Sequence, residues 1–168
     1  MTRTQPTTPT ATVTRIAATD TAMRGLGAVV GRQARAGDLL ILSGPLGAGK
    51  TTFTQGLGQG MSVRGPVTSP TFAIARTHPS LVQGPALVHA DAYRLAAAEE
   101  MEDLDLDLSL PESVTVIEWG EGLAEGLSDE RLEVAIDRLA DDTRTVRFTA
   151  VGARWVDALA GLGTDELE

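Results

Sequence analysis

The sequence predicts an α/β sandwich with a mostly parallel sheet and antiparallel edge strands. Short apolar runs alternate with stretches of helical spacing, which is typical of parallel strands joined by helices. A glycine-rich turn over residues 44–49 joins one apolar run, residues 39–42, to the next helical stretch. Near the C-terminus, residues 132–138 and 143–151 alternate in hydrophobicity on either side of a turn, as antiparallel strands do. The 168 residues fit one domain that needs no disulfides, and the sequence has no cysteine.

The N-terminal elements lead up to the glycine-rich turn. Residues 1–11 are rich in threonine and proline and have almost nothing to bury, so we expect a disordered tail. Residues 13–16 alternate in hydrophobicity and predict a short edge strand. Thr19 or Asp20 can cap the helix that follows, which we expect to end near Gly37.

Strands and helices continue to alternate through the rest of the chain. In order, we expect a strand over 38–43, a helix over 51–61, a loop over 62–70, strands over 72–77 and 86–91, a helix over 96–103, a strand over 113–118, an antiparallel pair over 132–138 and 143–151, and a closing helix over 154–162. The glycines at 56, 58 and 60 should weaken the helix over 51–61. The expected domain spans residues 12–162 and is followed by an acidic tail over 163–168.

The glycine-rich turn meets every position of the phosphate-binding pattern G-x-x-x-x-G-K-[ST], between a strand and a helix as that pattern requires. Glycines let the backbone wrap around a phosphate chain, so that N–H groups and the start of the next helix face the anion. Lys50, the only lysine in the chain, would reach the β- and γ-phosphates, and the Thr51 hydroxyl would bind Mg²⁺. The candidate nucleotide contacts are Gly44, Pro45, Leu46, Gly47, Ala48, Gly49, Lys50, Thr51 and Thr52. The fold is therefore expected to be a P-loop NTPase-like sandwich.

Two carboxylates end apolar strands and complete the predicted site. A phosphate-binding loop works with an acidic residue at the end of a neighbouring strand, which holds Mg²⁺ or orients the nucleophile. Glu118 ends the run 113–118 and is our candidate for the metal site, while Asp91 ends the run 86–91 and could orient or deprotonate a water molecule. The alternative for each is a helix cap or a surface salt bridge.

The roles of a loop and of a tryptophan remain open between two interpretations, and the two histidines receive no chemical role. The loop Ser69-Pro-Thr71-Phe72 could sense the γ-phosphate as a switch, or it could be an ordinary turn. Trp119 could contact the nucleotide or a partner, or it could belong to the core. His78 and His89 lack a partner at metal-ligand spacing, so we assign them no metal.

The charge distribution bears on the kind of partner. The net charge is −9, and residues 91–137 hold fifteen acidic side chains against two arginines. Direct nucleic-acid binding is disfavoured because there is no long basic run; the acidic stretch could meet a basic protein, or could simply maintain solubility. The sequence has no long apolar run and no apolar segment near its N-terminus, so we expect a cytoplasmic protein that does not span a membrane.

Four ordered motifs together resemble one known family. They are Gly44-Pro-Leu-Gly-Ala-Gly-Lys-Thr-Thr52, Thr68-Ser-Pro-Thr-Phe72, His89-Ala-Asp-Ala-Tyr-Arg94 and Ile117-Glu-Trp-Gly-Glu121. In this combination, and over residues 13 to about 150, the chain resembles the TsaE (YjeE) family. These are bacterial ATPases required for the threonylcarbamoyl modification of adenosine 37 in tRNAs that read ANN codons.

The resemblance implies ATP and Mg²⁺ as ligands, and the TsaB and TsaD subunits as partners, with tRNA reached indirectly through that complex. It assigns phosphate and metal binding to Lys50 and Thr51, completion of the Mg²⁺ site to Glu118, and the role of second essential carboxylate to Asp91. It also makes Asp20 a nucleotide contact.

In the same way, the resemblance makes residues 69–72 a switch-like loop and Trp119 part of the active-site surface. The chain departs from the family pattern at Pro45, where Asp or Asn is usual, and at Met23, where Thr is frequent. Neither departure removes a phosphate or metal ligand.

Two other functions compete with an accessory ATPase. A small-molecule kinase would need an arginine-rich lid, whereas Arg64, Arg76 and Arg94 are the only arginines between the phosphate-binding loop and residue 130. A nucleotide-binding interaction module without hydrolysis would not need Lys50, Asp91 and Glu118 together. Phosphate release measured with and without partners and acceptors separates the three.

Overall fold

The structure is a computed structural model of the whole chain, and it describes residues 8–45, 47–68, 75–91, 110–118 and 128–162. Several predictions fall outside these ranges. They concern Leu46, the loop over 69–72 with Ser69 and Thr71, the helix over 96–103, Trp119, and most of the two tails.

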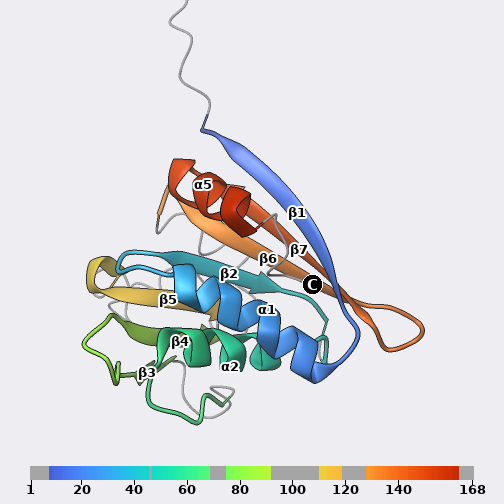
Figure 1. Cartoon of the computed structure of the whole chain (residues 1–168), viewed down its shortest axis with the longest axis horizontal. Helices are drawn as coiled ribbons and strands as arrows, with labels where there is room; N and C mark the ends of the chain where they lie inside the picture. Colours follow the sequence, from blue (N-terminus) through green and yellow to red (C-terminus); the bar gives the residue numbers. More distant parts are fainter. Residues whose placement is uncertain (1–7, 46, 69–74, 92–109, 119–127, 163–168) are drawn as a thin grey trace, which may run out of the picture.

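The described strands form one seven-stranded sheet in the order β1-β7-β6-β2-β5-β4-β3 (Figure 1). Their bounds are β1 Thr10–Ala17, β2 Leu39–Ser43, β3 Ala75–His78, β4 Ala86–Asp91, β5 Ser113–Glu118, β6 Arg131–Arg138 and β7 Arg144–Val151. The four central strands β6, β2, β5 and β4 are parallel, and β3, β7 and β1 are antiparallel to their neighbours. This confirms the predicted mostly parallel sheet with antiparallel strands at its edges.

The described helices are α1 Asp20–Gln33, α2 Lys50–Met61 and α5 Ala153–Leu162, together with the short 3₁₀ helix η2 Leu110–Glu112. α1 and α2 lie over the central strands, and α5 packs against β1 and β7 (Figure 1). None of the helices in the described part of the chain is long and apolar enough to cross a membrane.

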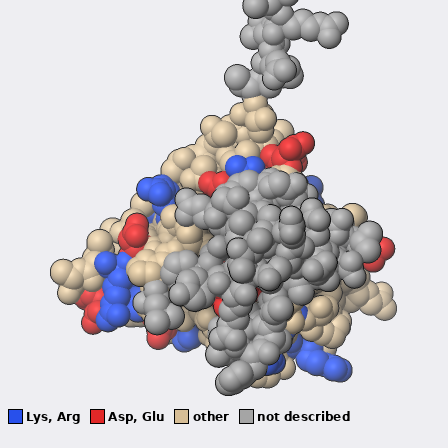
Figure 2. Space-filling model, turned by 180° about the vertical axis from the view of Figure 1, so that it is seen from behind, with Lys and Arg blue, Asp and Glu red and all other residues tan. Residues whose placement is uncertain are grey.

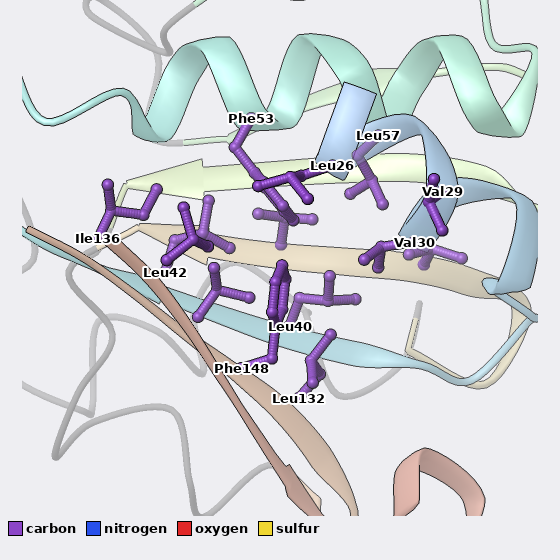
Figure 3. Close-up of a cluster of buried hydrophobic side chains, with 14 of the residues drawn as sticks. Leu26, Val29, Val30, Leu40, Leu42, Phe53, Leu57, Leu132, Ile136 and Phe148 are labelled. Atoms are coloured by element: carbon purple, nitrogen blue, oxygen red, sulfur yellow. The ribbon is translucent and has the colours of Figure 1, made fainter. Parts of the chain in front are cut away.

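The core lies between these helices and one face of the sheet. Leu40 and Leu42 of β2 point toward Phe53 of α2 (Figure 3). The Phe53 and Phe148 rings pack with their centroids 6.0 Å apart. Because alternate strand residues point to the same face, every second position of β2, β5, β6 and β7 contributes to this core. The apolar faces of the strands and helices therefore form the core of the predicted α/β sandwich.

α1 begins as the sequence predicts and ends earlier. The Thr19 side chain caps the helix by accepting a hydrogen bond from the Ala22 N–H, at 3.0 Å. The helix ends at Gln33 and not near Gly37, because Ala34 already has an extended backbone. Gly37 lies in the following turn, where its φ is 96° and its N–H donates to the Ser113 carbonyl.

α1 and α2 cross at glycines, which gives these residues a packing role in addition to the predicted weakening of α2. A Cβ added at Gly56 would overlap the Arg24 carbonyl group, and one at Gly60 would overlap that of Ala28. In return, a Cβ at Gly27 would overlap the Phe53 carbonyl oxygen. The glycines therefore cost helix propensity, but they let the two helix backbones approach closely.

The strands at the two edges differ from their predicted bounds. β1 begins at Thr10, so the last two residues of the predicted tail are strand residues. The reason is packing, since Ala11 pairs with Ala150 of β7 and packs against the core. At the other edge, β3 covers Ala75–His78, one residue beyond the predicted end.

Candidate functional site

The phosphate-binding loop lies between Ser43, the last residue of β2, and Lys50, the first residue of α2. Gly44 and Gly49 have φ values of 149° and 114°, a region that residues with a side chain rarely adopt. A Cβ at Gly44 would also overlap the carbonyl oxygen of Ile136 in β6. The motif glycines are therefore required by the backbone and by the neighbouring strand, as well as by any ligand.

The N-terminus of α2 has no internal cap. Its N-cap residue, Gly49, makes no side-chain hydrogen bond, and the first turn contains no acidic residue. The N–H groups at the start of a helix lack partners within that helix and carry a partial positive charge. α1, by contrast, is capped by Thr19 and has Asp20 in its first turn. The start of α2 is therefore the helix end suited to an anion.

Lys50 is the buried cation of this loop. Its Nζ donates to the carbonyl oxygens of Gly44 at 2.8 Å and Pro45 at 3.1 Å, and the residue is 6% exposed. Burial lowers the pKa of Lys50, and the charges of Glu118 and Asp91 oppose that shift. The ammonium group is thus held at the loop and within electrostatic reach of both predicted carboxylates.

The sheet register brings the two carboxylates to the edge where the loop begins. Asp91 of β4 pairs with Glu118 of β5, and Glu118 pairs on its other side with Leu42 of β2. Glu118 is 3% exposed and Asp91 is half-buried. The expectation that both side chains open onto the same edge as Lys50 agrees with this arrangement.

Glu118 has buried capacity for a further contact. Among the described residues, its Oε1 atom has no hydrogen-bond partner, and the His89 Nε2 atom lies 3.5 Å away. Carboxylate and hydroxyl oxygens are the protein ligands that Mg²⁺ prefers, and Mg²⁺ is usually held by one or two carboxylates together with phosphates and water. Glu118 and the half-buried Thr51 therefore fit such an ion by their chemistry. The described residues hold no group of three or more His, Asp or Glu side chains at metal-binding geometry.

Other predicted residues lie around the loop. Thr52 is half-buried in the first turn of α2. Asp20 is exposed at the start of α1, and the same helix places the buried Met23 against Gly49. The start of α1 is thus next to the loop, as a nucleotide contact by Asp20 would require.

Arg144 is a residue of this site that the sequence analysis missed. It is the first residue of β7, and its Nε donates to the Ala48 carbonyl oxygen at 3.0 Å. Its Nη2 lies 3.4 Å from the Gly47 carbonyl oxygen, and its Nη1 donates to Asp142. No local signal could have revealed it, because 96 residues separate Arg144 from Ala48.

Most of the acidic stretch that the sequence singles out lies outside the described residues. On the face that Figure 2 shows, the described acidic and basic side chains are interspersed. Among the described residues, the Arg131 Nε atom lies 2.9 Å from the Glu133 carboxylate.

Sequence comparison places the chain among known proteins. The profile of the family described as threonylcarbamoyl adenosine biosynthesis protein TsaE matches residues 17–146. A Streptomyces coelicolor protein named tRNA threonylcarbamoyladenosine biosynthesis protein TsaE is 60% identical over 81% of this chain and 95% of its own length. The Mycobacterium bovis protein of the same name is 48% identical over 83% of this chain and 86% of its own length.

A solved structure agrees with these relatives. The crystal structure of Bacillus subtilis YdiB superposes with a TM-score of 0.75 and 30% sequence identity, and the match covers 92% of this chain and 96% of that one. The likeness therefore extends over most of both chains. The chain belongs to the TsaE family, whose members take part in the biosynthesis of threonylcarbamoyladenosine in tRNA.

Proposed function

We propose that this protein is a Mg²⁺-dependent ATPase that acts as an accessory factor of the complex that makes N6-threonylcarbamoyladenosine at position 37 of tRNA. One observation carries the proposal. The uncapped start of α2, the buried Lys50 and the two strand-end carboxylates meet at one edge of the sheet. Nucleoside triphosphate hydrolysis depends on positioning and charge stabilisation, and these groups supply both.

Each group has a distinct part in hydrolysis. The N–H groups of the loop and the Lys50 ammonium bind the β- and γ-phosphates, and stabilise the charge that develops on them. To reach a phosphate, Lys50 exchanges its bonds to the Gly44 and Pro45 carbonyls for bonds to the anion. Thr51 and Glu118 would hold Mg²⁺, which neutralises phosphate charge and orients the oxygens of the transferred group.

Asp91 acts on the attacking water. It lies beside Glu118 in the neighbouring strand and is half-buried, so a water molecule can reach it. Its carboxylate orients the water and accepts a proton as the bond to the γ-phosphorus forms and the bond from that phosphorus to the β–γ bridging oxygen breaks, which releases ADP and phosphate. Asp91 thus serves the nucleophile, while Glu118 serves the metal.

The proposed partners are TsaB and TsaD, and the reason is the family together with the acidic stretch over 91–137. A strongly acidic segment speeds association with a basic surface, and salt screens this effect. Because the proposed role is that of an accessory factor, ATP turnover by the isolated chain should be slow, and the two subunits should raise it. The gain should shrink as the salt concentration rises.

The test is phosphate release by the full chain, alone and with TsaB and TsaD, combined with gel filtration of the mixture. Asp91→Asn should still join the complex but lose the stimulated rate, and Glu118→Gln should lose hydrolysis far more than nucleotide affinity. Fast turnover without partners, or no association at any salt concentration, contradicts the accessory role. Phosphate transfer to a small acceptor would instead make the protein a kinase, and binding without turnover an interaction module.

A further inference from the structure

The Glu118 carboxylate is buried away from solvent. The residue is 3% exposed, and among the described residues its Oε1 atom has no hydrogen-bond partner. A buried carboxylate is costly unless hydrogen bonds or a cation compensate for the lost water. In the proposed function the cation is Mg²⁺, which needs one oxygen of Glu118 aimed at the phosphates. Something must then hold the other oxygen.

His89 is the side chain placed to do this. It lies in β4 and is fully buried, and its Nε2 atom is 3.5 Å from the Glu118 Oε1 atom. Neither ring nitrogen of His89 has a hydrogen-bond partner among the described residues. Two buried and unsatisfied groups, one a donor and one an acceptor, therefore face each other at slightly more than hydrogen-bond distance.

The sheet register explains why they meet. His89 pairs with Val116 and Asp91 pairs with Glu118, so His89 is diagonal to Glu118 across the β4–β5 ladder. His89 and Asp91 share a face because they are two apart in β4, and Glu118 shares that face because it is the direct partner of Asp91. All three residues therefore lie on the same side of the sheet. Diagonal neighbours are within reach of long side chains. A small rotation of either side chain closes the gap to a hydrogen bond.

We propose that His89 is a positioning residue for Glu118: its Nε2–H donates to Oε1 and leaves the other carboxylate oxygen to the metal ion. This inference rests on the proposed function, because it requires Glu118 to be the Mg²⁺ ligand. Groups that hydrogen-bond to metal ligands orient them, and losing one typically weakens metal affinity about 10- to 100-fold. His89 itself contacts neither nucleotide nor metal in this arrangement.

Two substitutions of His89 separate its hydrogen bond from its volume. The side-chain nitrogen of Gln can occupy the place of the imidazole Nε2, whereas that of Asn reaches only the place of Nδ1. His89→Gln should therefore preserve the function, and His89→Asn should lose it. His78→Asn is the matched control, because His78 is also buried with an unpartnered Nε2 atom but lies in β3, one strand further from β5.

The experiment measures binding of the non-hydrolysable analogue AMPPNP to the full-length protein by calorimetry, over a range of Mg²⁺ concentrations and with none. His89→Asn should raise the Mg²⁺ concentration for half-maximal tightening by about tenfold or more. For His89→Gln and His78→Asn, this Mg²⁺ concentration should stay within about twofold of the value for the parent. Without Mg²⁺, all variants should bind AMPPNP like the parent, because the loop and Lys50 are unchanged. If His89→Asn does not fold, His89→Thr replaces it, since Thr suits a strand and its hydroxyl is too short to reach Glu118.

The outcomes distinguish this inference from the proposed function. Parental Mg²⁺ dependence in His89→Asn, or equal weakening in the Asn and Gln variants, overturns the positioning role and leaves the proposed function standing. If Mg²⁺ does not tighten AMPPNP binding by the parent, the metal role of Glu118 fails, and the proposed function fails with it.

Discussion

The two ends of strand β2 both hold buried charges, and the structure treats them in opposite ways. At the N-terminal end, the Asp38 Oδ2 atom accepts the Arg35 N–H at 2.6 Å and the Arg154 Nη2 at 3.0 Å. Arg154 also donates to the Gln33 carbonyl and lies over the Trp155 ring, at 4.7 Å from its centroid. This pair ties the end of α1, the start of β2 and α5 together.

At the C-terminal end of β2, the contacts made by the described polar groups are of a different kind. The Glu118 side chain is buried and its Oε1 atom lies 3.5 Å from the His89 Nε2 atom, and the start of α2 has no side-chain cap. Lys50 reaches the carbonyl oxygens of its own loop. Buried polar groups in proteins are normally paired, and the exceptions concentrate where a ligand completes them. The comparison assigns stability to one end of β2 and ligand binding to the other.

Lys50→Ala tests the assignment of ligand binding to the C-terminal end of β2, and we expect it to have the largest effect. Nucleotide affinity should fall by at least about 100-fold, because the cation that binds phosphate is lost. The free energy of unfolding should change by less than about 2 kcal/mol, because burying the ammonium group is itself costly and this cost offsets its hydrogen bonds to the Gly44 and Pro45 carbonyls. Calorimetric titration with ATP and urea unfolding measure the two effects. Parental affinity would mean that the phosphate-loop assignment is wrong.

The reverse pattern is expected at the other end. Arg154→Met keeps most of the side-chain length but leaves the Asp38 carboxylate buried without its cation, so unfolding should become easier by about 2–3 kcal/mol. Nucleotide affinity should stay within about twofold of the parent. Arg32→Met, at an exposed position in the last turn of α1, is the control and should shift stability by less than about 0.5 kcal/mol. A loss of nucleotide affinity in Arg154→Met would show that the two ends are coupled.

Arg144→Gln tests whether the hydrogen bonds from Arg144 support the phosphate-binding loop, a role that we call the brace. Without the guanidinium, the carbonyls of Gly47 and Ala48 lose a charged donor, and the loop N–H groups become less well oriented. Nucleotide affinity should fall about tenfold, with little change in stability. Arg147→Gln removes the same charge from an exposed position of β7 and should leave affinity unchanged. Equal losses in both variants would point to net charge and away from the brace.

The smallest expected effect is a pH dependence at Asp38. Burial raises the pKa of Asp38 above its ordinary value of 3.8, and the Arg35 N–H and the Arg154 guanidinium only partly oppose the shift. The folded state then binds this proton more tightly than the unfolded chain, so stability falls as pH rises from about 3.8 through the raised pKa. Relative to Asp38→Asn, the parent should lose stability in urea unfolding as the pH rises above about 4. A constant difference between parent and variant would rule out the raised pKa.

Much of the fold follows from local patterns. The capping Thr19, the apolar runs that end at Asp91 and Glu118, and the alternating pair β6 and β7 each predict an element that the structure contains. These signals work because helix caps and strand alternation depend on residues close together in sequence. Where the boundaries differ, as at the start of β1, packing against a distant strand extended the element.

The sequence by itself determined the phosphate-binding loop and the two strands that end in Asp91 and Glu118, because glycine conformation and strand periodicity are local properties. Only the tertiary structure decided which side chains support that loop. Arg144 reaches it from the other end of the chain, His89 faces Glu118 through the sheet register, and the glycines of α1 and α2 meet at a helix crossing. No single segment encodes these contacts, because each depends on how two distant backbones are placed relative to one another.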